Sequence, residues 1–144
     1  MARRHKGNFS LKHPPNITIA KEVAAAVTDR MAEGTISCRT AFALADECAA
    51  TPSTIGTAID LQEGRITRCQ LGLFGYGPDE TPLEGVGMVD DELKAAIRAT
   101  LENGRLSCKL AWRIADDRHR SRLTVGRACE SLGVRIDRCQ LGAF

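Results

Sequence analysis

The chain has 144 residues, of which 43% are apolar, 26% are charged and 4% are aromatic. This composition predicts a globular protein of one domain or two small ones, and no apolar run approaches the roughly 20 residues that a membrane-spanning helix needs. The basic amino terminus lacks the apolar segment of a secretory signal. We therefore expect a cytoplasmic protein without membrane contact, whose six cysteines are reduced.

The net charge of +2 is unevenly distributed along the chain. Residues 1–20 carry four basic side chains and no acid, and residues 21–88 carry five basic and ten acidic side chains. Residues 89–144 carry eleven basic and eight acidic side chains. A polyanionic partner would therefore prefer the amino terminus and the last third of the chain.

Residues 1–19 are predicted to form a basic amino-terminal arm, because they contain Gly7 and the pair Pro14-Pro15 but no periodic apolar pattern. Arms of this composition are commonly disordered. Residues 75–88 are predicted to be a linker, since four glycines and two prolines interrupt both helix and strand there.

One stretch of the chain occurs twice, seventy positions apart and without a gap: residues 34–74 match residues 104–144. The matching positions include Gly56 and Gly126, and both copies close with the sequence RCQLG. The similarity extends upstream, so that we expect a first unit over residues 20–74 and a second over residues 89–144. Each has the length of a small domain with a modest core, and the pattern indicates a tandem duplication.

The first segment of each unit is predicted to be a helix, over residues 20–33 and 90–103, because apolar residues recur at i, i+3 and i+4. Asp90 suits the N-cap of the second copy. Gly34 and Gly104 are predicted to end these helices. A short extended piece follows at residues 35–36 and 105–106.

Two further helices and a strand are expected in each unit. Ser37 and Ser107 suit the N-caps of the second helix. Thr51 and Pro52 suit the N-cap and first position of the third, and Ser121 takes the cap position in the second copy. Residues 65–74 and 135–144 alternate apolar and polar side chains, which favours a strand.

This order of elements resembles the winged helix-turn-helix domain. In that motif a small residue on one helix packs beneath the next, a small or turn residue follows about four positions later, and a branched aliphatic about ten positions later. The positions that fit are Ala45, Ala49 and Ile55 in the first copy and Ala115 and Val125 in the second. His119 stands where a small residue or glycine is usual, and a full wing hairpin is not evident. The expected fold is mainly α with small β, built as two tandem winged-helix-like units.

The resemblance implies a DNA-binding transcriptional regulator that contacts double-stranded DNA through the start of the third helix. Arginine, serine and threonine suit contacts with bases and phosphates, and the second unit is richer in them. We therefore predict that the second unit binds and the first does something else, with the arm adding non-specific attraction to phosphate. The predicted DNA-binding residues are Arg118, Arg120, Ser121, Arg122, Thr124, Arg127 and Arg138 in the second unit, Ser53 and Thr57 in the first, and Arg3 and Arg4 in the arm.

Other interpretations stay open. Arginines on a helix often form only a solvated face, and winged helices often bind proteins, so the acidic first unit would suit a protein partner or a homodimer. Gly56 and Gly126 lie inside the predicted third helices, where glycine costs about 0.5–1 kcal/mol relative to alanine. A backbone must approach closely there, and a neighbouring helix or a DNA strand would explain it.

The cysteines allow a third interpretation. Cys38 and Cys69 recur as Cys108 and Cys139, and each pair would lie close if the two strands of a unit pair. Such thiols would form a redox disulfide or half of a metal site, or would simply fill a small core. The chain has no C-x-x-C sequence and its histidines are scattered, so no metal or cofactor is expected. No catalytic constellation or phosphate-binding loop is evident, and we do not expect an enzyme.

Overall fold

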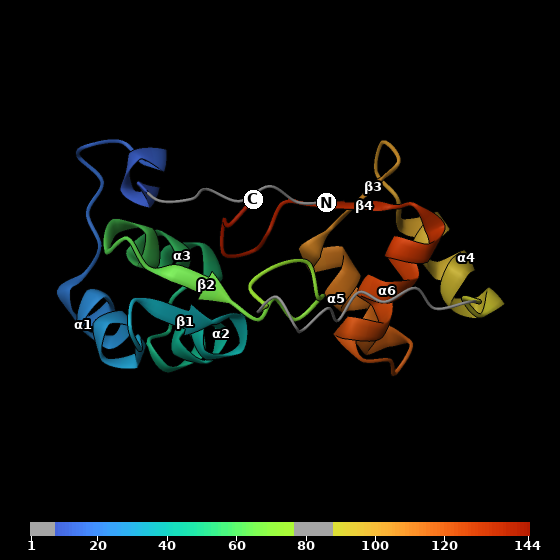
Figure 1. The fold of residues 1–144 in the computed structure, drawn as a ribbon, viewed down its shortest axis with the longest axis horizontal. Helices are drawn as coiled ribbons and strands as arrows, with labels where there is room; N and C mark the ends of the chain where they lie inside the picture. The colour runs from blue at the N-terminus through green and yellow to red at the C-terminus, as the bar shows by residue number, and fades with distance from the viewer. Residues whose placement is uncertain (1–7, 77–87) are drawn as a thin grey trace. The chain divides into compact units, whose positions relative to one another are not determined.

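The computed structural model describes residues 8–76 and 88–144, and these residues are mainly helical with four short strands. Both halves have the same order of elements (Figure 1). The first half contains α1 (Lys21–Arg30), β1 (Thr35–Ser37), α2 (Cys38–Glu47), α3 (Pro52–Leu61) and β2 (Arg65–Thr67). The second contains α4 (Asp91–Thr100), β3 (Arg105–Ser107), α5 (Cys108–Asp117), α6 (Arg122–Leu132) and β4 (Arg135–Asp137). The prediction of a mainly α fold with small β is confirmed.

Side chains cap most of the helices as the sequence predicts. A hydroxyl or carboxylate at the N-cap accepts a hydrogen bond from a backbone N–H of the first turn, which would otherwise lack a partner. The capping residues are Ser37, Thr51, Asp90, Ser107 and Ser121. Pro52 occupies the first turn of α3, where its missing N–H is harmless.

The glycines that were predicted to end the first helices lie beyond them. Helix α1 ends at Arg30, and Glu33 and Gly34 follow with φ angles of 51° and 75°. Ala32 and Thr35 exchange backbone hydrogen bonds of 2.9 Å across this pair. Two consecutive residues with positive φ form the tight turn that brings the chain into β1, so Gly34 serves the turn and that prediction was wrong. The second half repeats this turn at residues 103–104.

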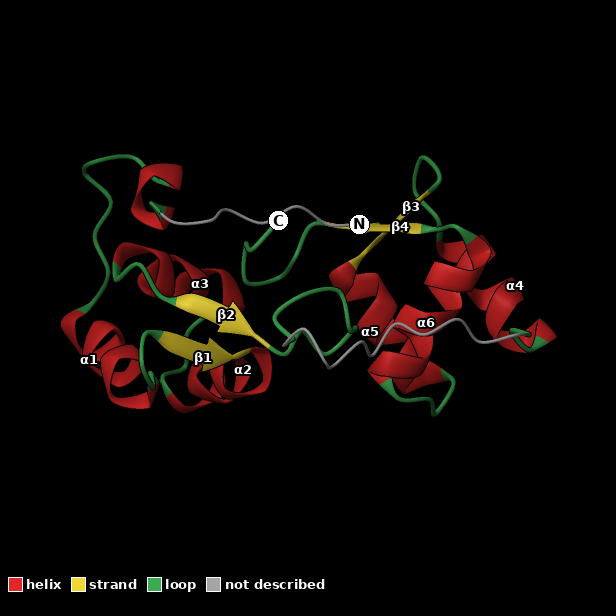
Figure 2. Ribbon diagram, in the orientation of Figure 1, coloured by secondary structure: helices red, strands yellow, loops and turns green. Residues whose placement is uncertain are grey.

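The two strands of each half run parallel, as Figure 2 shows for β1 and β2. Ile36 pairs with Ile66 in the first sheet and Leu106 with Ile136 in the second. Parallel neighbours need a crossover connection, and the two helices between them supply it. Within the described residues the strands form no β-hairpin, so the likeness to a winged helix does not include a wing.

The last strand of each half is shorter than predicted. Strands β2 and β4 stop after three residues because Arg68 and Arg138 have a φ of 50°, which no strand can accommodate. The prediction of strands over residues 65–74 and 135–144 was therefore wrong beyond Thr67 and Asp137. The left-handed arginine instead turns the rest of RCQLG away from the sheet.

The helix-turn-helix positions have the packing that the motif requires. Ala45 and Ala115 are buried on α2 and α5, and Ile55 and Val125 are fully buried on α3 and α6. The turn residue between the helices has a positive φ in both halves, at Ala49 (49°) and His119 (54°). Glycine suits this position because it adopts a positive φ at little cost, and alanine and histidine adopt it here with some strain.

The chain forms two compact units, and each contains a short piece of the other repeat. The N-terminal unit comprises the described residues of Arg3–Cys69 together with Gln140–Ala143. The C-terminal unit comprises those of Gln70–Cys139 together with Phe144. We call residues 70–73 the first tail and residues 140–143 the second tail. The units differ in this respect from the predicted ranges 20–74 and 89–144, and most of the predicted linker lies outside the described residues.

Each tail packs against a glycine in the third helix of its unit. A Cβ atom on Gly56 of α3 would lie 1.8 Å from the carbonyl oxygen of Leu141, and one on Gly126 of α6 would lie 1.9 Å from that of Leu71. Both leucine side chains are buried, at 2% and 0% exposure. The backbone that approaches these glycines is therefore that of a tail, and neither a neighbouring helix nor a DNA strand.

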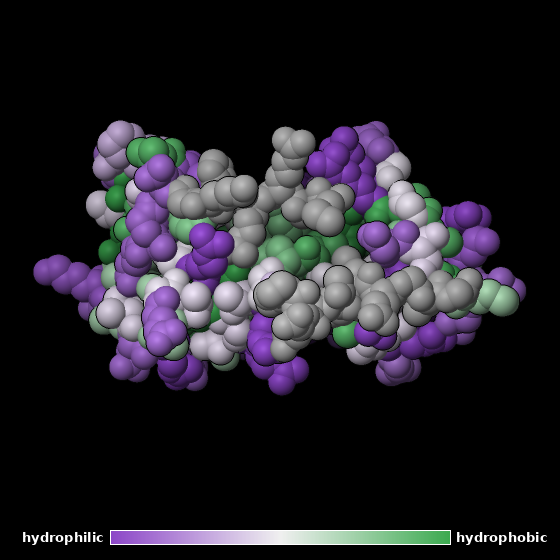
Figure 3. Space-filling view, viewed as in Figure 1, coloured by the Kyte–Doolittle hydropathy of each residue, from purple (hydrophilic) through white to green (hydrophobic). Residues whose placement is uncertain are grey.

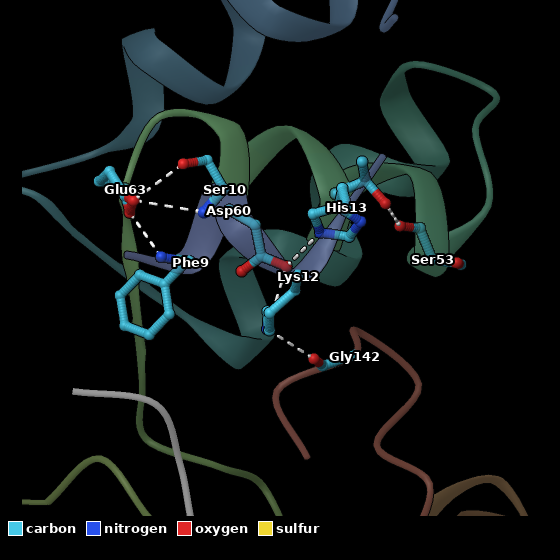
Figure 4. A network of polar contacts seen from close by, with 9 residues as sticks. Phe9, Ser10, Lys12, His13, Ser53, Asp60, Glu63 and Gly142 are labelled. Carbon is cyan, nitrogen blue, oxygen red and sulfur yellow. Dashed lines mark hydrogen bonds and ion pairs between the residues drawn. The ribbon is translucent and has the colours of Figure 1, made fainter. Parts of the chain in front are cut away.

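Residues 8–13 pack against α3, which corrects the expectation of a disordered arm for this part of the chain (Figure 4). They include a short 3-10 helix, η1 (Phe9–Lys12), whose Phe9 side chain is buried. The backbone N–H groups of Phe9 and Ser10 donate to the carboxylate of Glu63 at 2.6 and 3.2 Å. Arg3 and Arg4 lie outside the described residues.

A second set of contacts joins η1, α3 and the second tail (Figure 4). The buried carboxylate of Asp60 contacts Lys12 Nζ at 3.1 Å and His13 Nε2 at 2.8 Å. Lys12 also donates to the carbonyl oxygen of Gly142 at 2.9 Å. The amino-terminal segment thus covers α3 and holds the second tail.

We predict opposite effects of Gly56→Ala in two backgrounds. In the native chain the added methyl group meets the Leu141 carbonyl, so the free energy of unfolding should fall by about 1–3 kcal/mol, as for other overpacked cores. In a Leu141→Asp chain, whose second tail cannot bury its side chain, the same change should raise it by about 0.5–1 kcal/mol through helix propensity. Urea unfolding of the four chains measures both effects. Equal effects in the two backgrounds would contradict the packing described here.

Candidate nucleic-acid interface

Arg122, the first residue of α6, is held from two sides. Its guanidinium lies over the ring of Trp112 on α5, 3.6 Å from the ring centroid. Its Nη1 donates to Oε1 of Gln70 in the first tail at 2.6 Å. Stacking and a hydrogen bond together restrict the side chain's rotamers. A half-buried arginine is thereby oriented at the start of the helix that resembles a recognition helix.

The hydroxyl groups at the start of α6 serve the helix itself. Ser121 Oγ accepts from the N–H of Thr124 at 3.0 Å and lies 2.7 Å from Thr124 Oγ1. On α3, Thr57 donates back to the carbonyl oxygen of Ser53 at 3.0 Å, an ordinary contact of threonine within a helix. These predicted DNA-binding residues therefore have structural roles, and Ser53 and Ser121 are exposed.

Two of the predicted arginines form ion pairs with the start of α4. Arg118 contacts Glu92 at 3.1 Å and Arg120 contacts Asp90 at 2.5 Å. The hydrogen bond from Arg120, and after it the N–H of Leu93, holds the pKa of the Asp90 carboxyl below its ordinary value. The same pairing raises the pKa of Arg120. Exposed pairs of this kind contribute little to stability, so a phosphate group can compete for both arginines.

Arg138 makes its contacts with a different set of residues. It contacts Glu102 at 2.9 Å and Asp137 at 3.4 Å, and these two acids raise its pKa. The three residues, with Asn103 and Arg105, line an open hollow of about 350 Å³. Its charge is mixed, which gives it no preference for anions. Arg127, farther along α6, is half-buried.

The middle of α6 is covered, whereas its first turn is open. The first tail lies against Gly126, whereas Ser121 is exposed and the next three residues are partly exposed. Sequence reasoning missed two basic residues on the helix before it: Lys109 and Arg113 are exposed on α5. Their i, i+4 spacing, with Trp112 between them, places them on one side of that helix. That spacing was legible in the sequence.

The first half of the chain has only one of these four basic side chains. The positions that match Lys109, Arg113, Arg122 and Arg127 hold Arg39, Ala43, Pro52 and Thr57. In addition, η1 and the second tail cover the middle and end of α3. The predicted asymmetry between the halves therefore has a structural counterpart, because only the C-terminal unit has an arginine at the open start of its third helix and two exposed basic side chains on the helix before it.

The cysteines behave as core residues. The described part of the chain contains no disulfide, and Cys38, Cys69, Cys108 and Cys129 are buried. Burial raises the pKa of the Cys129 thiol to about 12, so it stays protonated and unreactive at neutral pH. No group of three or more potential metal ligands occurs among the described residues.

The surface gives few other signs of a site. Polar residues cover much of the face of each unit in Figure 3. The large apolar side chains exposed in the described residues are Leu11, Leu61 and Met88. None of the described helices has both the length and the apolar character for a membrane span.

The low pKa of Asp90 predicts a specific dependence on pH. Because the folded-state pKa is lowered, the cap and the ion pair contribute to stability above the ordinary carboxyl pKa and are lost as the pH falls through the lower folded value. A ¹³C NMR titration of the Asp90 carboxyl should therefore give a midpoint below 3.8, and Arg120→Ala should raise it. Arg118→Ala, which removes the neighbouring pair, serves as the control and should leave that midpoint nearly unchanged. A normal midpoint in the native chain would contradict the pairing.

Comparison with models of known protein families, with curated proteins and with solved structures finds no match to this chain. What the chain does must therefore be inferred from its own residues, and the oriented Arg122 with its basic neighbours is the strongest feature among those described.

Proposed function

We propose that the protein is a DNA-binding transcriptional regulator whose C-terminal unit contacts double-stranded DNA. The observation that carries the proposal is the orientation of Arg122 at the open start of α6, held by Trp112 and Gln70. Helix-turn-helix proteins contact base edges with the first residues of the recognition helix. Arginine is the side chain best suited to bind guanine or phosphate with two parallel hydrogen bonds.

The contact proposed here is narrower than insertion of the whole helix. The first tail covers α6 at Gly126, so the first turn of α6 supplies the base contact. Lys109 and Arg113 on α5 supply phosphate contacts, as the helix that crosses the backbone does in helix-turn-helix proteins. Arg118 and Arg120 add two more when phosphate displaces Glu92 and Asp90.

For the N-terminal unit we propose a role in protein contacts. The second tail and η1 cover the middle and end of its third helix, and the accessible first turn of that helix carries no basic side chain. Its exposed charges nearly balance: Glu22, Asp29, Glu33, Asp46, Glu47 and Glu63 are accessible, and so are Lys21, Arg30, Arg39, Arg65 and Arg68. A surface of mixed charge has little attraction for a polyanion and suits a protein surface of complementary charge.

A salt series tests the DNA contact. Binding to mixed-sequence duplex DNA should weaken steeply with salt, because each phosphate contact adds about 0.9 to the slope of log K against log salt. The double variant Lys109→Ala/Arg113→Ala should lower that slope by about 2. The matched control Arg39→Ala, at the position equivalent to Lys109 in the N-terminal unit, should leave it unchanged.

Arg122→Lys separates base contact from simple attraction. Lysine keeps the charge but lacks the planar pair of donors. It should therefore keep non-specific binding and lose discrimination between preferred and random sequences by about 1–3 kcal/mol. The proposal fails if the native protein does not bind duplex DNA at low salt. It also fails if the Lys109/Arg113 variant binds as well as the native chain.

A further inference from the structure

The second tail is held in the N-terminal unit by contacts that another copy of the same segment can make. We call the surface formed by Gly56 of α3 and Lys12 of η1 the Gly56 cradle. Gly56 lies against the backbone carbonyl of Leu141, whose side chain is buried, and Lys12 donates to the carbonyl oxygen of Gly142. None of these contacts depends on which chain supplies the tail. These contacts therefore do not require that tail and cradle belong to the same chain.

The sequence of the tails supports this independence. Both tails begin with Gln-Leu-Gly, and both lie in the unit of the other repeat with their leucine against a helix glycine. Exchange of this segment between equivalent partners is thus already present within one chain. Domain swapping between chains uses the same contacts and adds little cost when the connecting segment permits it.

The second tail is the less enclosed of the two. Gly142 is exposed, whereas the matching Gly72 is buried in the C-terminal unit. The chain passes from the C-terminal unit into this tail after Cys139, just beyond the left-handed Arg138. Phe144 returns to the C-terminal unit, where its carbonyl oxygen accepts from the N–H of Cys139 at 3.2 Å. A change in φ and ψ at Arg138 and Cys139, together with release of Phe144, redirects the last five residues of the chain.

We propose that two copies of this chain form a dimer by exchanging their second tails, each tail binding the Gly56 cradle of the other copy. Each chain has one such tail and one such cradle, so mutual exchange closes a two-fold dimer and leaves neither unfilled. The occupant of the cradle in the dimer is residues 140–143 of the second copy. This dimer does not depend on the proposed DNA binding.

Two complementary variants test the exchange. Gly56→Ala closes the cradle and releases a native tail, whereas Leu141→Asp disables the tail and leaves a native cradle open. Neither variant should form a tail-exchanged dimer alone. Mixed at about 100 µM, they should form a one-to-one complex of about twice the 15.6 kDa chain mass, measured by native mass spectrometry and light scattering.

The matched control replaces the first variant by the double variant Gly56→Ala/Leu141→Asp, which has neither a usable tail nor an open cradle. Mixed with Leu141→Asp, it should give at least tenfold less complex. Far-UV circular dichroism of each chain verifies that it is folded. Folded variants that form no more complex than this control pair would overturn the proposal.

If a variant does not fold, the native chain gives the decisive measurement. Copies labelled with ¹⁵N are mixed with unlabelled copies at high concentration, and native mass spectrometry seeks dimers of intermediate mass. Such dimers that are lost in a Leu141→Ala chain support the exchange. If only monomers are found at every concentration, or if the dimers persist in Leu141→Ala, the exchange does not take place.

Discussion

The close contact between a helix glycine and the backbone of a tail organises this protein. At Gly56 and Gly126 the missing side chain lets a leucine carbonyl approach to a distance at which no Cβ would fit. Each tail thereby leaves its own repeat and completes the core of the other unit with a buried leucine. Fully burying a leucine contributes about 1.5–3 kcal/mol, a large share for units this small. The glycine's unfavourable helix propensity is offset by this packing.

The same contact determines which surfaces remain for function. In the N-terminal unit the tail and η1 cover α3 together, and Lys12 bridges Asp60 and the tail. In the C-terminal unit the first tail covers the middle of α6 but places Gln70 where it orients Arg122. Both third helices keep an accessible first turn, but only that of α6 carries an arginine. The proposed division of roles between the units follows from this difference.

The local chemistry of the helices was legible in the sequence, because caps and helix-turn-helix spacing depend on near neighbours. Ser37, Asp90 and Ser121 cap as expected, and Ala45 and Ile55 are buried as expected. The sequence also indicated a close backbone at Gly56, but not its source. That source is a tail from the other repeat. Because both tails have the same Gln-Leu-Gly sequence, the sequence cannot tell which tail packs against which glycine. The sequence also did not reveal which acids pair with Arg118 and Arg120, because those acids lie about 30 residues earlier in the chain.

The source of each tail is the central claim, and NMR measures it directly. In a protein labelled selectively at glycine and leucine, nuclear Overhauser effects should join Gly56 to Leu141 and Gly126 to Leu71, since the atoms concerned are in van der Waals contact. If each tail packed on its own repeat, the effects would join Gly56 to Leu71 and Gly126 to Leu141. Observation of the first pair in a monomeric sample supports the exchanged cores, and observation of the second pair contradicts them.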